Sequence, residues 1–152
     1  MVAALKVAVG NDHAAIELKL VVAEHLGSLG VEVLNLGVDT TDAVDYPDVA
    51  ARVARTVAGG EADLGVLVCG TGIGMAMAAG KIDGVRAALC CYEYHARMAR
   101  EHNHANICCL GARVTGSELA KAIVAAFIAT APSDDPRHAR RVDKIQALQA
   151  TQ

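Results

Sequence analysis

The feature that most constrains this chain is a regular alternation of short apolar segments with longer amphipathic ones. A short, continuously apolar run is typical of a strand buried on both faces of a sheet. Such runs occupy residues 5–9, 31–36, 64–68, 85–89 and 106–110. Amphipathic stretches that predict helices occupy residues 14–29, 47–58, 73–79, 92–102, 116–130 and 136–150. Strict alternation of the two predicts an α/β fold of three layers, a Rossmann-like α/β/α arrangement with a five-stranded parallel sheet, right-handed crossovers and a C-terminal helix.

The size and composition fit a single domain over residues 1–152. The chain is 53% hydrophobic and 20% charged, which is typical of a globular protein rather than a disordered one. Its net charge is −3 and its positive charges are scattered, so neither nucleic acid nor an anionic membrane is an expected partner. No apolar run reaches the roughly 18–20 residues of a membrane span. The first residues resemble a strand rather than a signal peptide, and a cytoplasmic location is expected.

The five cysteines do not form a recognisable disulfide or zinc pattern. They stand at positions 69, 90, 91, 108 and 109, which is one odd residue and two adjacent pairs, with no CxxC spacing. We expect reduced, mostly buried thiols, with Cys69 as the exception. No HxH, HExxH or carboxylate cluster is present, so no metal and no other cofactor is expected.

Ligands of parallel sheets bind beyond the carboxyl ends of the strands. That rule selects residues 10–13, 69–74 and 111–113 as places for chemistry. We expect the segment that leads into the fifth strand, with His102 and Asn103, to join them.

The loop at residues 69–74 reads Cys-Gly-Thr-Gly-Ile-Gly and follows the third predicted strand. Its alternating glycines, Gly70, Gly72 and Gly74, allow a tight turn whose backbone N–H groups face an anion. The spacing GxGxG differs from the dinucleotide fingerprint GxGxxG, and no Gly-Lys-Ser/Thr follows as in a P-loop. The anion is therefore a phosphate or an oxyanion that develops during a reaction.

Cys69 precedes these amides and is the candidate base. A thiolate is favoured beside a helix N-terminus, and a base next to N–H donors suits proton abstraction beside a carbonyl. Thr71 could place its hydroxyl over the same point. Alternatively, Cys69 is an inert residue at a strand end and Thr71 an ordinary turn residue.

Three further polar groups have both a functional and a structural interpretation. Asp12 and His13 follow the first strand and could bind sugar hydroxyls and a phosphate, or Asp12 could only cap the next helix. His102 could donate a proton to a ring oxygen, or only interact with the carbonyl end of its helix. Arg137 and Arg141 share a helical face and could bind phosphate, or form a solvated basic surface.

Together these residues resemble the family of ribose-5-phosphate isomerase B and galactose-6-phosphate isomerase, nearly from end to end. The motifs that carry the resemblance are Asp12-His13, Asp45-Tyr46-Pro47, 59–63 (GGEAD), 69–74 (CGTGIG), 79–81 (AGK), 84–87 (GVRA), 100–103 (REHN), 111–113 (GAR) and 137–142 (RHARRV).

The resemblance implies a metal-free aldose–ketose isomerase that forms a homodimer or a dimer of dimers with active sites shared between subunits. It implies that Cys69 is the base, that Thr71 assists it, and that the amides of Gly70, Gly72, Ile73 and Gly74 hold a cis-enediolate. It further implies that His102 is the ring-opening acid with Asp12 nearby. The implied sugar and phosphate contacts are Tyr46, Asn103, Arg113, Arg137, Arg141 and His13. One branch of the family has a glutamate base just after the glycine loop, where this chain has Met75.

The expected reaction is conversion of ribose 5-phosphate to ribulose 5-phosphate. The nearest alternative keeps the chemistry but changes the sugar to an allose, galactose or erythrulose phosphate. Alternatives of other classes are a non-catalytic sugar-phosphate or nucleotide-binding module and a thiol-redox protein.

Overall fold

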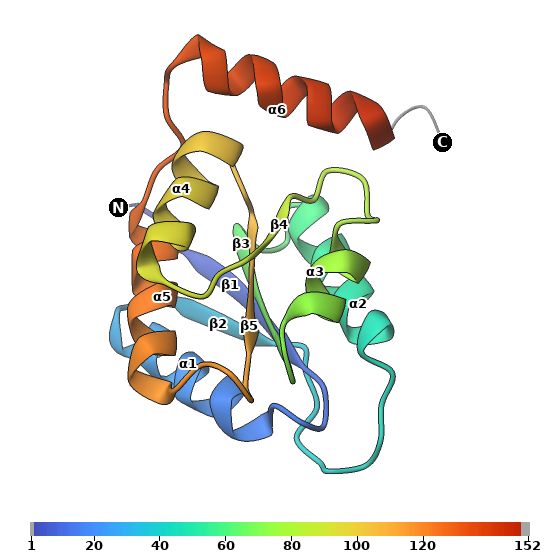
Figure 1. The fold of residues 1–152 in the computed structure, drawn as a ribbon. Coiled ribbons are helices and arrows are strands. Elements are labelled where there is room, and N and C mark those ends of the chain that lie inside the picture. The colour runs from blue at the N-terminus through green and yellow to red at the C-terminus, as the bar shows by residue number, and fades with distance from the viewer. Residues whose placement is uncertain (1, 150–152) are drawn as a thin grey trace.

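The computed structural model describes residues 2–149, and Figure 1 shows the arrangement of their helices and strands. In chain order the elements are β1 (Lys6–Asn11), α1 (Ile16–Ser28), β2 (Glu32–Asn35), α2 (Tyr46–Ala58), β3 (Leu64–Cys69), α3 (Ile73–Ala79), β4 (Ala87–Leu89), α4 (Glu93–Asn103), β5 (Ile107–Gly111), α5 (Ser117–Ala129) and α6 (Pro136–Gln149).

The five strands form one parallel sheet in the order β2-β1-β3-β5-β4. Helices α1, α4 and α5 cover one face, and α2 and α3 cover the other, so the predicted three-layer α/β/α fold is confirmed (Figure 1). The strand order reverses direction between β1 and β3, because β2 lies outside β1 while the later strands lie beyond β3. Such a reversal separates the loops after the two strands and leaves room for a ligand.

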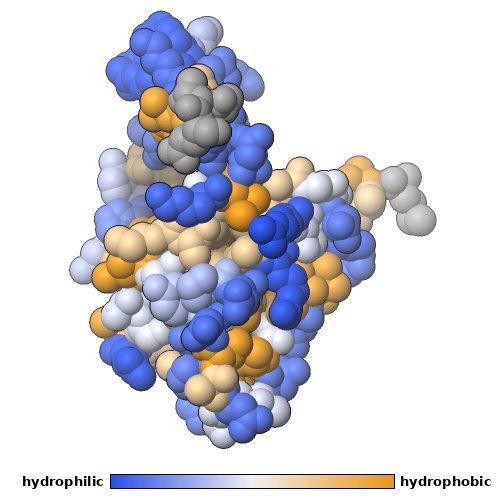
Figure 2. Space-filling model, turned by 90° about the vertical axis from the view of Figure 1, so that its right-hand side faces the viewer, coloured by the Kyte–Doolittle hydropathy of each residue, from blue (hydrophilic) through white to orange (hydrophobic). Residues whose placement is uncertain are grey.

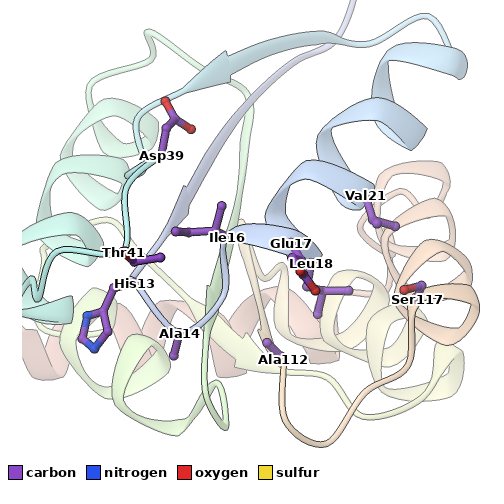
Figure 3. Close-up of a pocket in the computed structure, with 10 residues that line it drawn as sticks. All are labelled: His13, Ala14, Ile16, Glu17, Leu18, Val21, Asp39, Thr41, Ala112 and Ser117. Carbon is purple, nitrogen blue, oxygen red and sulfur yellow. The ribbon is translucent and has the colours of Figure 1, made fainter.

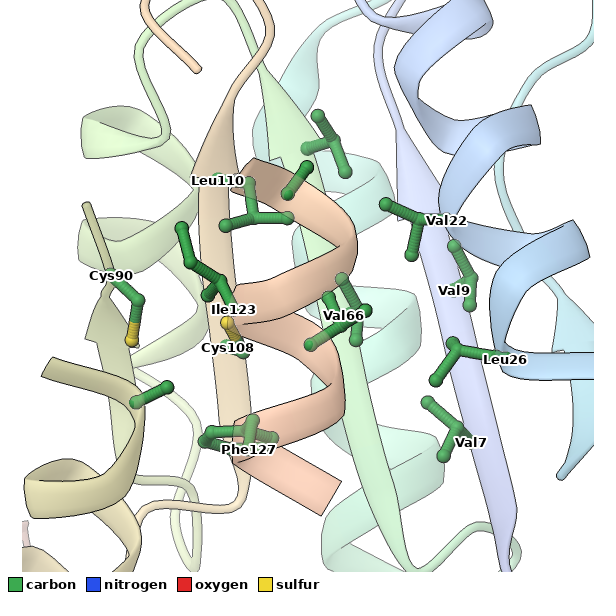
Figure 4. Close-up of a cluster of buried hydrophobic side chains, with 14 of the residues drawn as sticks. Val7, Val9, Val22, Leu26, Val66, Cys90, Cys108, Leu110, Ile123 and Phe127 are labelled. Carbon is green, nitrogen blue, oxygen red and sulfur yellow. The ribbon is translucent and has the colours of Figure 1, made fainter. Parts of the chain in front are cut away.

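The hydrophobic core lies on both faces of the three inner strands. Figure 4 shows one of its two clusters, where strand residues such as Val9, Val66 and Leu110 meet Ile123 and Phe127 of α5. The strands β1, β3 and β5 are buried almost throughout, as predicted. The same prediction is wrong for β2 and β4, whose residues are partly exposed. Each is an edge strand with a single neighbour, so the helices cover it incompletely.

The boundaries of the elements differ from the predicted ones by a few residues. The fourth strand begins at Ala87 rather than at residue 85, and the first helix begins at Ile16 rather than at residue 14. Gly30 has a φ of 81°, as expected for a glycine that follows a helix end. The last helix is described to Gln149, so its predicted end at Ala150 lies outside the described residues.

Helix α6 lies across the edge of the sheet where the strands begin, at the top of Figure 1. It packs against α4, and two glutamines fix its far end to the segment between α3 and β4. The side-chain amide of Gln149 donates to the carbonyls of Gly80 and Ile82, both at 3.0 Å. The amide of Gln146 donates to Asp83 Oδ1 at 3.3 Å. The helix is therefore attached to the body of its own subunit at both ends.

Candidate active site

A cavity of about 390 Å³ opens beyond the carboxyl ends of β1 and β3. The loops after three inner strands and the start of α2 contribute its walls. The residues that line it are Asp12, Tyr46, Cys69, Gly70, Thr71, Ile73, Gly74, Met77 and Arg113. The structure thus brings together most of the side chains selected from the sequence. Met77 was not among them, because an exposed methionine on a short helix carries no chemical signal of its own.

The glycine loop contacts the sulfur of Cys69. The backbone N–H of Gly72 donates to Cys69 Sγ, with 3.1 Å between nitrogen and sulfur. Gly72 has a φ of 79°, and a Cβ atom there would lie 2.6 Å from Leu89 Cδ1 and 2.9 Å from the carbonyl carbon of Leu110. Only glycine fits this backbone conformation and this space. The donor that faces the sulfur therefore depends on a glycine at position 72.

Thr71 has a structural role in the loop. Its Oγ1 accepts a hydrogen bond from the N–H of Ile73 at 3.3 Å, as a turn residue does. The residue also lines the cavity, so its hydroxyl lies at the site. Helix α3, which follows, has only seven residues. The loop amides themselves, rather than a long helix dipole, are the donors available to an oxyanion here.

Tyr46 packs directly on the end of the glycine loop. A Cβ atom on Gly74 would lie 2.6 Å from two carbons of the Tyr46 ring and 2.9 Å from its hydroxyl oxygen. Tyr46 is 40% exposed, so one side of the ring remains open to the cavity. Tyr46 and Gly74, which both line the cavity, are therefore in close contact there.

Asp12 and His13 follow β1 and line two different cavities. Asp12 is buried at the cavity, and its Oδ1 accepts from the N–H of Ala14 at 3.0 Å. This bond forms a turn ahead of α1, whose N-cap is Ala15, so Asp12 is not the helix cap that the sequence allowed. His13 is exposed and accepts a hydrogen bond at Nδ1 from the N–H of Val44, at 3.3 Å. It lines a neighbouring cavity of about 580 Å³ on the α1 side (Figure 3).

A buried polar network that the sequence analysis missed holds the loop between β2 and α2. Asn11 is fully buried, and its amide accepts from the N–H of Val38 at 3.1 Å and donates to the Val38 carbonyl at 3.0 Å. The fully buried Lys19 donates to the same carbonyl at 3.2 Å and forms an ion pair with Asp39. Figure 3 shows Asp39 at the start of this loop. A lysine at the sixth position of a predicted helix over residues 14–29 is normally interpreted as a surface charge, which is why sequence alone did not identify it.

His102, Asn103, Arg137 and Arg141 do not join this cavity within the subunit. Cys69 pairs with Gly111 at the carboxyl end of β5, while His102 precedes its amino end at Ile107. Four residues of strand separate those ends by about 13 Å. The expectation that His102 and Asn103 lie with the carboxyl-end loops is therefore wrong within one chain. A segment that enters a parallel strand necessarily lies at the opposite edge from a segment that leaves it.

These distant residues gather instead around α6. The rings of His102 and His138 stack, with centroids 4.2 Å apart and planes 12° from parallel. Asp135 accepts from the N–H of Arg137 at 2.8 Å and forms an ion pair with its guanidinium at 3.3 Å. Asp135 thus offsets part of the positive charge in the first turn of this helix. Its backbone hydrogen bond from Arg137 and the nearby positive charges lower the pKa of Asp135.

Comparison with known proteins identifies the family. The family model described as Ribose/Galactose Isomerase matches residues 7–145. The chain belongs to this family. Ribose-5-phosphate isomerase B of Escherichia coli is 44% identical over 144 residues, which cover 95% of this chain and 96% of that protein. D-erythrulose-4-phosphate isomerase of Pectobacterium atrosepticum is 42% identical, with 93% of each chain covered.

Solved structures of this ribose/galactose isomerase family have the same fold over their whole length. Type B ribose 5-phosphate isomerase of Trypanosoma cruzi superposes with a TM-score of 0.95 at 44% identity, covering 98% of this chain and 99% of that one. The ribose 5-phosphate isomerase of Thermotoga maritima gives a TM-score of 0.90 at 48% identity, covering 94% and 98%. The matched residues include α6 as well as the sheet, since the two superpositions cover 98% and 94% of this chain.

Within this isomerase fold, Met75, Cys90, Cys108 and Cys109 are buried outside the site, and Cys91 is half-buried. Met75, at the position where one branch of the family has glutamate, is fully buried in the core under α3. A hydrogen bond with Cys90 and burial raise the pKa of Cys108, and burial raises that of Cys109. Thiols of this kind are poor nucleophiles, which weakens the thiol-redox alternative. Cys69 is the only cysteine that lines the cavity at the glycine loop.

No group of three or more His, Cys, Asp or Glu side chains among residues 2–149 is arranged to bind a metal ion. None of the helices in that part of the chain is both long and apolar enough to cross a membrane.

Proposed function

We propose that the chain interconverts ribose 5-phosphate and ribulose 5-phosphate, an aldose–ketose isomerisation that passes through a cis-enediolate. The observation that carries this proposal is the placement of Cys69 Sγ under the N–H of Gly72, at the mouth of a cavity lined by further loop amides. The 44% identity to ribose-5-phosphate isomerase B over nearly the whole chain supports the same reaction.

In this reaction Cys69 takes a proton from one of the two carbons and returns it to the other. The N–H of Gly72 donates to Cys69 Sγ and fixes the position of the sulfur beside the cavity. The proposal assigns the charge of the enediolate oxygen to the N–H groups of Gly70 and Gly74, and to that of Ile73, which also donates to Thr71 Oγ1 at 3.3 Å. Donors that are already oriented need no reorganisation as that charge develops. Thr71 assists at the same oxygen.

The remaining roles belong to residues at the cavity wall. Tyr46 lies against the sugar and limits the width of the site, because its ring already contacts Gly74. Arg113 packs on Gly70, where a Cβ atom would lie 3.1 Å from its Nη1, and its charge attracts the phosphate end. Asp12 lies within the same cavity and orients a hydroxyl group. His13 lines the neighbouring cavity instead, where Val44 holds its Nδ1, and we assign its Nε2 to the phosphate end of the substrate.

We further propose that two subunits share each site. His102, Asn103, Arg137 and Arg141 lie at the other edge of the sheet, beyond reach of their own Cys69. In an antiparallel pair related by a two-fold axis, that edge of one subunit can face the carboxyl edge of its partner. Exposed apolar side chains near the cavity, Ile73, Met77 and Tyr92, are suited to such a contact. Figure 2 shows hydrophobic patches among polar residues on the side of the molecule that α2 and α3 form.

Replacement of the proposed base tests the chemistry. Cys69→Ala should lower kcat by about 10²-fold or more, since general-base catalysis contributes 10²–10⁴-fold. Exchange of the substrate C2 proton with deuterated water should stop, while a phosphorylated sugar-acid inhibitor still binds. Cys91→Ala, which removes a half-buried thiol outside the cavity, is the matched control and should be active. Full activity in Cys69→Ala would refute the proposed base, and a wild type without isomerase activity would favour a binding module.

A second sugar remains the specific alternative, because the erythrulose phosphate isomerase is almost as similar as the E. coli enzyme. Each additional hydroxylated carbon needs its own hydrogen-bond partner in the site. We expect kcat/KM to be highest for the five-carbon substrate in a series of four-, five- and six-carbon sugar phosphates. A higher value for another member of that series would change the assigned substrate and leave the proposed chemistry intact.

A further inference from the structure

A second large cavity lies at the edge of the sheet where the strands begin, away from the glycine loop. Its volume is about 640 Å³, and its charged and polar lining consists of Arg86, Arg100, His104, Asn106 and Asp63. None of these side chains has a role in the reaction proposed above. Two arginines against one aspartate make the lining predominantly cationic.

The two arginines have no carboxylate partner among residues 2–149. Arg86 donates from Nε to the carbonyl of His104 at 2.8 Å and from Nη1 to Gln146 Oε1 at 2.8 Å. Arg100 donates from Nε to the carbonyl of Thr130 at 3.1 Å and from Nη1 to that of Ala105 at 2.7 Å. These bonds fix both guanidinium groups and leave their Nη2 groups without a hydrogen-bond acceptor in the described part of the chain.

The positive charges of this pair are not neutralised. Burial lowers the pKa of Arg86 and of Arg100, and the charge of Arg86 lowers the pKa of Arg100 further. Two half-buried guanidinium groups that repel each other are stabilised by an anion between or beside them. The carboxylate of Asp63 is exposed and accepts from the N–H of Lys6 at 2.8 Å, and it forms no ion pair with either arginine.

His104 supplies an independent observation at the same cavity. Its Nε2 atom is buried and has no hydrogen-bond partner, the single such side-chain atom found among the described residues. The residue also has a φ of 48°, an uncommon conformation for a side chain other than glycine. A buried polar atom without a partner costs free energy unless a ligand or water satisfies it. Rotation of the imidazole would turn its N–H toward an anion that the arginines hold.

We propose that this cavity is a second anion site, which binds a small oxyanion such as phosphate or a phosphate monoester through Arg86, Arg100 and His104. The proposal is independent of the reaction assigned to the glycine loop. Arg86 also bonds Gln146 of α6, the helix that carries Arg137 and Arg141. An occupied site would hold Arg86 more rigidly, and so would stabilise the position of that helix.

Titration with inorganic phosphate tests the site in the full chain. At constant ionic strength, the side-chain nitrogen resonances of His104, Arg86 and Arg100 should shift and reach saturation. Arg100→Met should weaken this binding by about tenfold or more, the effect of losing one charge-assisted hydrogen bond. Arg97→Met removes an exposed charge from the same helix and should leave the affinity unchanged. Arg113→Met should weaken only the phosphate response of the glycine-loop amides, which separates this site from the catalytic one.

His104→Asn provides a second variant if Arg100→Met does not fold, because asparagine tolerates a positive φ. It should also lower the affinity measured on the Arg86 resonance. Shifts that never saturate would mean an adventitious ion only and would overturn the proposal. An equal affinity in the wild type and in both variants would overturn it as well.

Discussion

The ammonium group of Lys19 forms an ion pair with the carboxylate of Asp39, although the lysine side chain is fully buried and Asp39 is largely exposed. The pair joins α1 to the loop between β2 and α2. That loop carries Val44, whose N–H bonds His13, and it leads directly into Tyr46. A single buried charge therefore fixes the backbone that positions two residues of the candidate site.

The unequal burial of this pair predicts an unequal cost for removing each partner. Asp39→Ala leaves a buried ammonium group without its counter-charge and should destabilise the protein more than removal of the lysine does. Lys19→Met leaves only an exposed carboxylate and should cost about 1–2 kcal/mol. Urea unfolding of the two variants and of the double variant measures both values. Equal costs, or a greater cost for Lys19→Met, would contradict this account.

The contact between Gly74 and Tyr46 predicts a specific effect on substrate binding. Gly74→Ala places a methyl group 2.6 Å from the tyrosine ring, which must move. We expect KM to rise several-fold and stability to fall by about 1–3 kcal/mol, as in other overpacked sites. Gly27→Ala is the matched control, since its methyl group would have no neighbour within 4 Å. That helical substitution should leave the kinetics unchanged and stabilise the protein by up to about 1 kcal/mol.

The stacked rings of His102 and His138 predict a pH-dependent attachment of α6. Burial lowers the pKa of His138 from its usual 6.5, and the nearby His102 and Arg137 charges lower it further, while Asp135 opposes them. The detached helix therefore binds a proton more readily than the attached one. Attachment is strongest above pH 6.5 and weakens as the pH falls through that value toward the lowered pKa.

Hydrogen exchange of the α6 amides measures this effect. Exchange, corrected for its intrinsic pH dependence, should be faster at about pH 5.5 than at about pH 7.5. His138→Gln should remove most of the difference. An unchanged pH dependence in that variant would show that His138 is not the responsible group.

The proposed sharing of sites predicts that two inactive chains can restore activity together. A chain that ends before Pro136 lacks Arg137 and Arg141, while Cys69→Ala lacks the base. A mixed dimer should contain one complete site, with up to about half of the wild-type activity per dimer. Each chain alone should be inactive. A verified mixed dimer without activity would show that each subunit supplies its own site.

Much of this fold could be predicted because its signals are local. Five apolar runs in β1 to β5 and the amphipathic stretches between them predicted the parallel α/β/α fold. The spacing of Gly70, Gly72 and Gly74 after a strand predicted a loop of inward-facing amides, and the structure places Asp12, Tyr46 and Arg113 around it. These features can be recognised in the sequence because each arises from residues that are neighbours along the chain.

Which distant residues lie together depends on the order of the strands and on the edge of the sheet at which each loop lies. Only the tertiary structure showed this. It separated His102, Asn103, Arg137 and Arg141 from Cys69, since the segment before β5 and the loop after β3 lie at opposite edges. It also showed that Lys19 is a buried charge, which no helical pattern reveals, because burial depends on a loop twenty residues further along the chain. Adjacent residues determine the local chemistry. Long-range pairing and burial depend on how the whole chain packs.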